Sequence, residues 1–180
     1  FDATEQGLID YQLFIDRFSA LTNLYLDLPI AAVVEPTAFA STVSNGGVAR
    51  TGCFDARQIQ LHERALDYAL KRLASNANIF TYLDYGDPSW PGSYNGEQAL
   101  LELLANSQLT DGSPAVEGIS LNVGSYVPLE EPFMLAQDNS GEPYVLPKGV
   151  HSVNAHVEYL QSYLQDYANI QLSVLVDTAR

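Results

Sequence analysis

The sequence has a single cysteine, Cys53, and only 8 lysines and arginines against 22 acidic residues in a chain of 180. One cysteine cannot form a disulfide within the chain, so a disulfide from Cys53 needs a partner elsewhere, and a lone buried thiol is the alternative. The formal net charge of −14 repels phosphate backbones and anionic lipids, which makes nucleic acids and membranes poor partners. No apolar run approaches the roughly 20 residues that span a bilayer.

Motifs of several enzyme classes are also missing. The sequence has no P-loop, no G-x-G-x-x-G after a strand and no G-x-S-x-G elbow. His151 and His156 lie five residues apart without a third ligand nearby, so we predict a solvated loop and helix start for them rather than a metal site. His62 is predicted to be a helix-surface residue. The sequence therefore predicts neither a metal nor a cofactor.

The composition is that of a globular protein, with 47% hydrophobic and 17% charged residues. Apolar runs alternate with amphipathic segments along it. Their spacing predicts helices over about residues 8–20, 55–74, 97–105 and from 152 onward, and strands over 29–34, 79–83, 116–123 and 170–176. Residues 127–150 are predicted to form a long loop.

Strands that alternate with helices predict an α/β fold with a parallel sheet. We expect residues 1–180 to form a single domain. Because a complete barrel typically needs about 250 residues, the chain is short for one, and these β/α units are expected to form only part of a barrel.

Polar residues follow each predicted strand, at the end where parallel α/β folds bind ligands. These residues are Glu35, Asp84, Asp87, Asn122, Tyr126 and Asp177. Trp90 stands nearby in a segment rich in proline and glycine, where it suits stacking on a sugar ring, with a hydrophobic plug over the strand ends as the alternative. The sequence therefore predicts a shared concave site for a carbohydrate.

Four motifs in the same order resemble glycoside hydrolase family 6, which cleaves β-1,4-glucan with inversion. Residues 33–41 resemble that family's "IEPDSLAN", and residues 82–90 resemble "YLDAGHAGW". Residues 118–126 are similar to "GLATNVANY", and residues 176–180 to "VDTGR". The resemblance implies a distorted (β/α) barrel and a secreted, extracellular protein that acts on a polysaccharide such as cellulose.

The resemblance also implies roles for the residues at the strand ends. Trp90 would be a sugar platform and Asp84 a buried carboxylate that shapes the site. Asn122 and Tyr126 would line the cleft. From their place at the strand ends, we also expect Glu35 and Asp177 to contact substrate.

One residue departs from the family pattern. Thr37 occupies the position of the aspartic acid that protonates the leaving oxygen. Because a threonine hydroxyl cannot donate that proton near neutral pH, we predict a degenerate site that binds a β-glucan rather than hydrolysing it efficiently. An active inverting hydrolase that uses Asp87 as a replacement acid is one alternative. A scaffold that acts through an outer surface, as in a toxin or defence protein, is another.

The resemblance covers only the middle of the family's barrel. It implies that a further segment or a second polypeptide completes the cleft. It also places Cys53 where the family has a cysteine bonded to one in the preceding part of the barrel. We therefore expect Cys53 to form a disulfide with another segment or chain.

Overall fold

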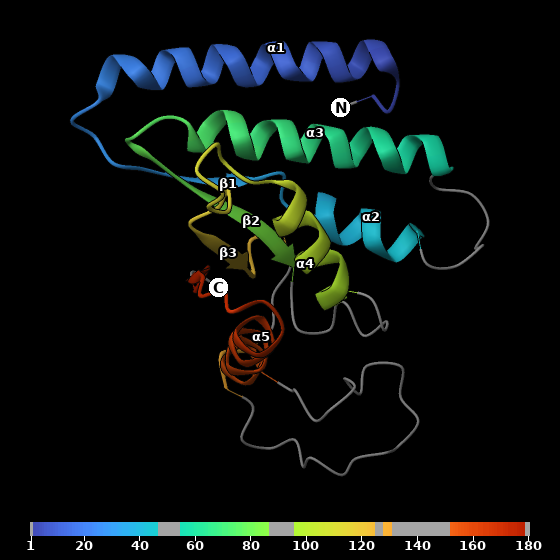
Figure 1. The fold of residues 1–180 in the computed structure, drawn as a ribbon, viewed down its shortest axis with the longest axis vertical. Helices are drawn as coiled ribbons and strands as arrows, with labels where there is room; N and C mark the ends of the chain where they lie inside the picture. The colour runs from blue at the N-terminus through green and yellow to red at the C-terminus, as the bar shows by residue number, and fades with distance from the viewer. Residues whose placement is uncertain (1, 47–54, 87–95, 125–127, 131–151, 179–180) are drawn as a thin grey trace.

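The computed structural model describes residues 2–46, 55–86, 96–124, 128–130 and 152–178. The elements in chain order are α1 (Glu5–Thr22), η1 (Asn23–Tyr25), β1 (Ile30–Val34), α2 (Ala38–Gly46), α3 (Ala56–Ala74), β2 (Ile79–Gly86), α4 (Gly96–Asn106), β3 (Gly118–Leu121), α5 (Val153–Ala168) and β4 (Ser173–Val176). The four strands form one parallel sheet in the order β1-β2-β3-β4 (Figure 1). The predicted α/β class and parallel sheet are confirmed.

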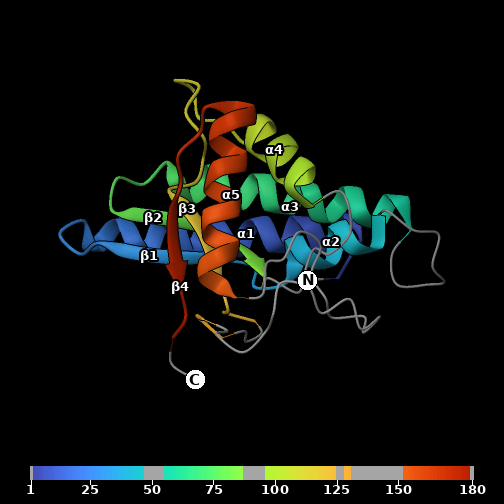
Figure 2. The ribbon, with the colours of Figure 1, turned by 90° about the horizontal axis from the view of Figure 1, so that it is seen from below.

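Burial alternates over the first half of β2 and shows which face of the sheet the helices cover. Ile79, Thr81 and Leu83 are buried on one face, whereas Phe80 on the opposite face is 42% exposed. The buried face packs against α2 and α3, which both contact β2, and Figure 2 shows α5 beside β4. The sheet therefore has one face covered by helices and one face, in the part of the chain described, that is partly open.

Local signals in the sequence explain where the helices begin. Asp55 caps α3 in a capping box with Gln58, and the Ser152 hydroxyl accepts a hydrogen bond from the Ala155 amide at the start of α5. Both caps lie where the sequence predicts these helices to begin. No helix among the described residues is long and apolar enough to cross a membrane.

The sequence pattern missed α2 altogether. Apart from Phe39 and Asn45, the nine residues of AFASTVSNG are small or β-branched, and they give no apolar stripe long enough to stand out as a helical period. The helix forms because Phe39, 4% exposed, packs into the core against the ring of Tyr85. Tertiary contact, rather than intrinsic propensity, decides this element.

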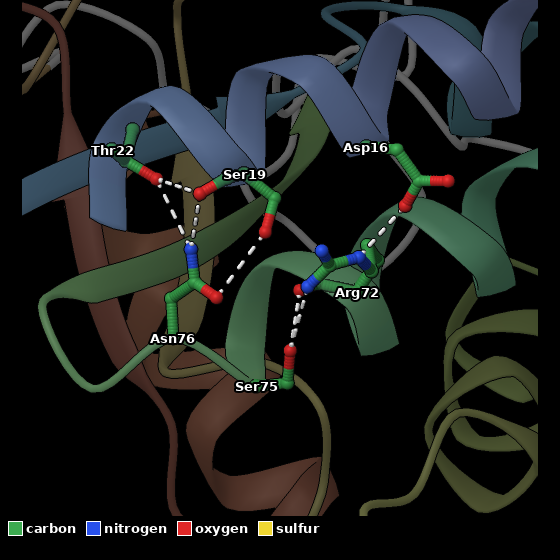
Figure 3. Close-up of polar contacts among 6 residues, drawn as sticks. All are labelled: Asp16, Ser19, Thr22, Arg72, Ser75 and Asn76. Carbon is green, nitrogen blue, oxygen red and sulfur yellow. Dashed lines mark hydrogen bonds and ion pairs between the residues drawn. The ribbon is translucent and has the colours of Figure 1, made fainter. Parts of the chain in front are cut away.

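A buried amide network holds α1 and η1 to the connection between α3 and β2 (Figure 3). Asn76 Nδ2 donates to the Ser19 carbonyl at 2.9 Å and to Thr22 Oγ1 at 3.1 Å, while its Oδ1 accepts from Ser19 Oγ at 3.2 Å. Asn78 Nδ2 lies 3.1 to 3.2 Å from the carbonyls of Thr22, Tyr25 and Leu28. These contacts lie at the amino ends of the strands, so their role is to fix the fold rather than to form the ligand site.

We expect Asn76→Ala to lower the free energy of unfolding by about 1–3 kcal/mol, because it removes the acceptor of the buried Ser19 hydroxyl and one donor each to the Ser19 carbonyl and Thr22 Oγ1. Urea denaturation measures this change. Ser75→Ala is the matched control: Ser75 is exposed, and its loss should change stability by no more than about 0.5 kcal/mol. Equal effects from the two variants would contradict the role given to Asn76.

Candidate functional site

The carboxylate of Asp84 joins the ends of three neighbouring strands. Asp84 lies near the carboxyl end of β2 and is 0% exposed. Its Oδ2 accepts a hydrogen bond from the Thr37 amide, beyond β1, at 2.6 Å, and its Oδ1 accepts one from Ser120 Oγ, on β3, at 3.2 Å. A buried carboxylate is tolerated only with such partners, so Asp84 fixes how these strand ends sit relative to one another.

Backbone strain gathers at the same edge of the sheet. Glu35, Thr37 and Asn122 have φ angles of 48°, 68° and 65°, in the left-handed region that L-residues other than glycine and asparagine rarely adopt. For the β-branched Thr37 this conformation is particularly unfavourable. Strain of this kind persists only where the surroundings hold it in place, and it concentrates at functional sites.

The segment after β3 closes over the segment after β1. Gly124 has no side chain, and the Thr37 methyl group Cγ2 occupies the space that a Cβ at Gly124 would need. The Asn122 amide donates to the Gly86 carbonyl at 3.1 Å, and the Asn122 side chain is buried. The ends of β1, β2 and β3 are thus packed against one another around Asp84.

Glu35 points its carboxylate toward α1. It interacts with the hydroxyl of Tyr11, and burial first, then the Glu35 charge, raise the pKa of Tyr11 well above its ordinary value. Burial lowers the pKa of His62 in α3, and the negative charge of Glu35 acts in the opposite direction and raises it. His62 is half-buried rather than fully on the helix surface. The described contacts of Glu35 are therefore with the helices, and its predicted role in sugar binding stays a prediction.

The prediction for His156 was wrong. It is 4% exposed and its ring lies 5.6 Å from that of Tyr85, which is itself fully buried at the end of β2. The residue follows the α5 cap by one turn, and α5 turns it toward the sheet instead of toward solvent. His151 lies outside the described residues.

The structure thus brings together Asp84, Thr37 and Asn122 at one edge of the sheet. Asp177, after β4, is partly exposed, and its amide donates to the Leu121 carbonyl at 3.1 Å, which places it beside the end of β3. Four predicted residues lie outside the described residues: Cys53, Asp87, Trp90 and Tyr126. Their predicted roles stay predictions.

Two residues of the site were not predicted. Ser120 lies within a buried strand, and Gly124 looks like an ordinary turn residue in the sequence. Knowledge of the strand register would have indicated Ser120, because Asp84 and Ser120 are paired and paired residues of neighbouring strands share a face. No signal in the sequence indicates the contact of Gly124 with Thr37.

No group of three or more histidine, cysteine, aspartate or glutamate side chains in the described ranges is arranged to hold a metal ion. Of the described side chains at the strand ends, Asp177 is partly exposed, whereas those of Asp84 and Asn122 are buried.

Comparison with known proteins relates this site to its family. The model of glycosyl hydrolases family 6 matches residues 1–180. The chain belongs to this family. A protein named "Probable 1,4-beta-D-glucan cellobiohydrolase C" from Aspergillus fumigatus is 33% identical over 127 residues, which are 70% of this chain and 27% of that protein. Exoglucanase A from Cellulomonas fimi is 29% identical over 137 residues, 73% of this chain and 15% of that protein.

Solved family 6 structures share the fold. Cellobiohydrolase II (Cel6A) from Humicola insolens, in complex with glucose and cellotetraose, superposes with a TM-score of 0.74 at 25% identity, covering 98% of this chain and 46% of that one. The catalytic domain of Cellulomonas fimi Cel6B superposes with a TM-score of 0.79 at 21% identity, covering 99% of this chain and 42% of that one. The chain therefore spans less than half of each of these family 6 structures, and the predicted partial barrel agrees with them.

A double-mutant cycle tests the contact between the segments that follow β1 and β3. We expect Gly124→Ala to destabilise the chain by about 1–3 kcal/mol, because its new methyl group overlaps Thr37 Cγ2. In the background of Thr37→Ser, which removes only that methyl, the loss should fall by about 1 kcal/mol or more in urea denaturation.

Gly112→Ala is the control for this cycle. Gly112 has a φ of 85° and nothing within 4 Å of its Cβ position, so its cost is backbone strain alone and should be the same with or without the Thr37→Ser substitution. If the losses of stability from Thr37→Ser and Gly124→Ala simply add in the double variant, the contact between the two residues is not formed.

A separate cavity of about 350 Å³ lies on the helical side of the sheet, between α2, α3 and α4. Glu63 from α3 and Glu102 from α4 both line it. Glu63 is exposed on α3, yet partial burial of its carboxyl group first, and then the charge of Glu102, raise its pKa above the ordinary value. Folding thus favours the protonated form of Glu63. The free energy of unfolding therefore falls as the pH rises from the ordinary pKa of a glutamate through the raised pKa of Glu63.

We therefore expect Glu63→Gln to raise the melting temperature at pH 7 and to have little effect at pH 4. The gain at pH 7 should shrink in high salt, which screens the repulsion by Glu102. Thermal unfolding at both pH values measures this. The control is Glu158→Gln on the exposed side of α5, and a gain of equal size there would contradict the explanation.

Proposed function

We propose that this chain forms the substrate-holding wall of a family 6 glucan cleft, in a secreted protein that binds a β-1,4-glucan and has little hydrolytic turnover. One observation carries the proposal. At the carboxyl end of β1, where the family resemblance expects the proton donor, Thr37 stands with its amide committed to the buried Asp84.

Two of the carboxylates at the described strand ends, those of Asp84 and Glu35, support weak turnover. Asp84 is enclosed and accepts hydrogen bonds from Thr37 and Ser120, so its carboxylate is shielded from a sugar at the sheet edge. Glu35 interacts with Tyr11 on the helical side. An inverting hydrolase needs a carboxyl group that donates a proton to the leaving oxygen, and removal of such a group costs roughly 10²- to 10⁴-fold in rate.

Binding uses the side chains that remain at the strand ends. Asp177, which is partly exposed, supplies hydrogen bonds to sugar hydroxyls, and the buried Asn122 shapes the strand end beside it. Trp90 and Tyr126 supply stacking and a further hydroxyl. Cellotetraose, the oligosaccharide in the structure of the Humicola insolens relative, is the corresponding probe. Because this chain spans less than half of that relative, a further part of the barrel forms the opposite wall of the cleft.

Titration calorimetry with cellotetraose tests binding. We expect Trp90→Ala and Asp177→Asn each to weaken the affinity by about tenfold, which corresponds to the loss of about 1.4 kcal/mol of stacking or hydrogen bonding. Asp166→Asn, exposed on α5, removes the same charge and should leave the affinity unchanged. Unchanged affinity in both Trp90→Ala and Asp177→Asn would sink the proposed cleft.

Reducing-sugar release over a pH series distinguishes the binder from a hydrolase. We expect Thr37→Asp to raise the rate by about 10²-fold or more at unchanged cellotetraose affinity, while Thr110→Asp, in an exposed turn, has no effect. Substantial release by the unaltered chain that Asp87→Asn abolishes would instead establish the alternative, a hydrolase with Asp87 as its acid.

A further inference from the structure

Helix α5 carries a row of three tyrosines along one flank. Tyr159, Tyr163 and Tyr167 are four residues apart, so the helical period places each of them about 6 Å further along the axis and on nearly the same side. The ring centroids of Tyr159 and Tyr163 lie 6.2 Å apart, and those of Tyr163 and Tyr167 lie 4.5 Å apart. Figure 2 shows α5 beside β4, the last strand of the sheet. The row is therefore a stack of phenol rings, with its closest contact near the C-terminal end of the helix.

The last ring of the row is open to solvent. Tyr167 is 72% exposed, whereas Tyr159 and Tyr163 are half-buried and Tyr159 packs against the hydrophobic core. Tyr25 is also mostly exposed, at 54%, but it makes no ring contact among the described residues. In the part of the chain that the structure describes, only Tyr167 thus combines access for a dissolved reagent with a second phenol in contact.

The composition makes tyrosine the main target of an oxidant. The chain has 11 tyrosines but only one tryptophan, one methionine and one cysteine, the other side chains that oxidants attack readily. With one cysteine, a disulfide within the chain is also impossible. A covalent link between two of its side chains therefore has to use another residue type.

We infer that Tyr163 and Tyr167 form a site of oxidative modification, at which a peroxidase and hydrogen peroxide join the two phenol rings by a carbon–carbon bond. Each tyrosine gives one electron to the peroxidase and its phenolic proton to water, which leaves a phenoxyl radical on each ring. The radicals combine through ring carbons next to the hydroxyl groups. The hydrogens on these two carbons then move to the oxygens, which restores both phenols.

The atoms and electrons of this reaction balance. The peroxidase passes the two electrons to hydrogen peroxide, which takes up two protons and becomes two molecules of water. The chain loses two hydrogen atoms in all. Helix α5 gains a covalent link across its last full turn, without a cysteine.

Tyr163 is the favoured partner for a radical on Tyr167. Groups held in contact meet at an effective concentration in the mM range or above, so at about 10 μM protein, coupling within the chain is favoured by about 10²-fold or more. The formal charge of −14 on each chain further disfavours the approach of a second copy. Tyr159 competes poorly for Tyr163, because their rings are farther apart and Tyr159 is held against the core.

The test treats the complete 180-residue chain with a haem peroxidase and equimolar hydrogen peroxide. Trypsin cuts after Lys148, and no lysine or arginine follows before Arg180, so all three tyrosines of α5 fall in one peptide of residues 149–180. We expect this peptide from the monomer to show dityrosine fluorescence and a mass lower by two hydrogen atoms. Its fragmentation should give no sequence ions from cuts between residues 163 and 167, because the link bridges them.

Tyrosine-to-phenylalanine variants locate the link, because each keeps the ring and removes only the hydroxyl that oxidation requires. Tyr163→Phe and Tyr167→Phe should each abolish the loss of two hydrogen atoms from this peptide. Tyr159→Phe, the same change one turn earlier in the row, should leave the yield unchanged. Circular dichroism checks that all three variants retain their helix content.

Thermal unfolding gives a second readout. The link should raise the melting temperature of the treated chain by about 2–5 °C, because it restricts residues 163–167 in the unfolded state as a disulfide of that span would. Treated Tyr167→Phe is the control: it undergoes the same exposure to oxidant but cannot form the link, so its melting temperature should not rise.

Cross-linked dimers as the main product would overturn the inference, since coupling would then occur between chains. It would also be overturned by a loss of two hydrogen atoms that persists in Tyr167→Phe and disappears in Tyr159→Phe, because the bridged pair would then be Tyr159 and Tyr163. Oxidised Tyr167 without any link would show that these two rings do not couple. None of these readouts involves a sugar, so they are independent of the proposed glucan binding.

Discussion

The buried carboxylate of Asp84 is the constraint on which the candidate site depends. It accepts hydrogen bonds from the Thr37 amide beyond β1 and from the Ser120 hydroxyl on β3, and so ties three strand ends together. A charge that is 0% exposed is unfavourable unless it is fully supported by donors, which gives these strand ends little freedom to move apart. The left-handed backbone of Thr37 is compatible with this demand, because its amide must point at the carboxylate.

The two ends of the sheet have different tasks. At the amino ends of the strands, Asn76 and Asn78 satisfy backbone carbonyls of α1 and η1 in a buried network that holds the helical layer to β2. At the carboxyl ends, strain and a buried charge are concentrated instead, which is typical of a ligand site built on a rigid scaffold. Stability contributed at one end supports unfavourable geometry at the other.

Membership of family 6 and the residue at position 37 point in different directions. The fold and the order of the strand ends are those of a family that includes cellobiohydrolases, yet the position that the family resemblance assigns to the acid holds a hydroxyl. Fold does not by itself decide chemistry, and the side chains at the site do. The proposed glucan binding rests on this difference, because Thr37 has no carboxyl group that could transfer a proton.

The sequence by itself determined the α/β class, the parallel sheet and the helix starts at Asp55 and Ser152, because these follow from apolar periodicity and capping, which are local. It also indicated the polar strand ends and their family. Only the tertiary structure decided that α2 forms, that His156 is buried beside Tyr85, and that Glu35 turns toward Tyr11. It alone showed that Ser120 and the Thr37 amide, 36 and 47 positions away along the chain, bind Asp84. These features depend on contacts between residues far apart in the chain. The pattern of a sequence does not contain the distances between such residues, nor does a short segment decide which side of a helix faces the sheet.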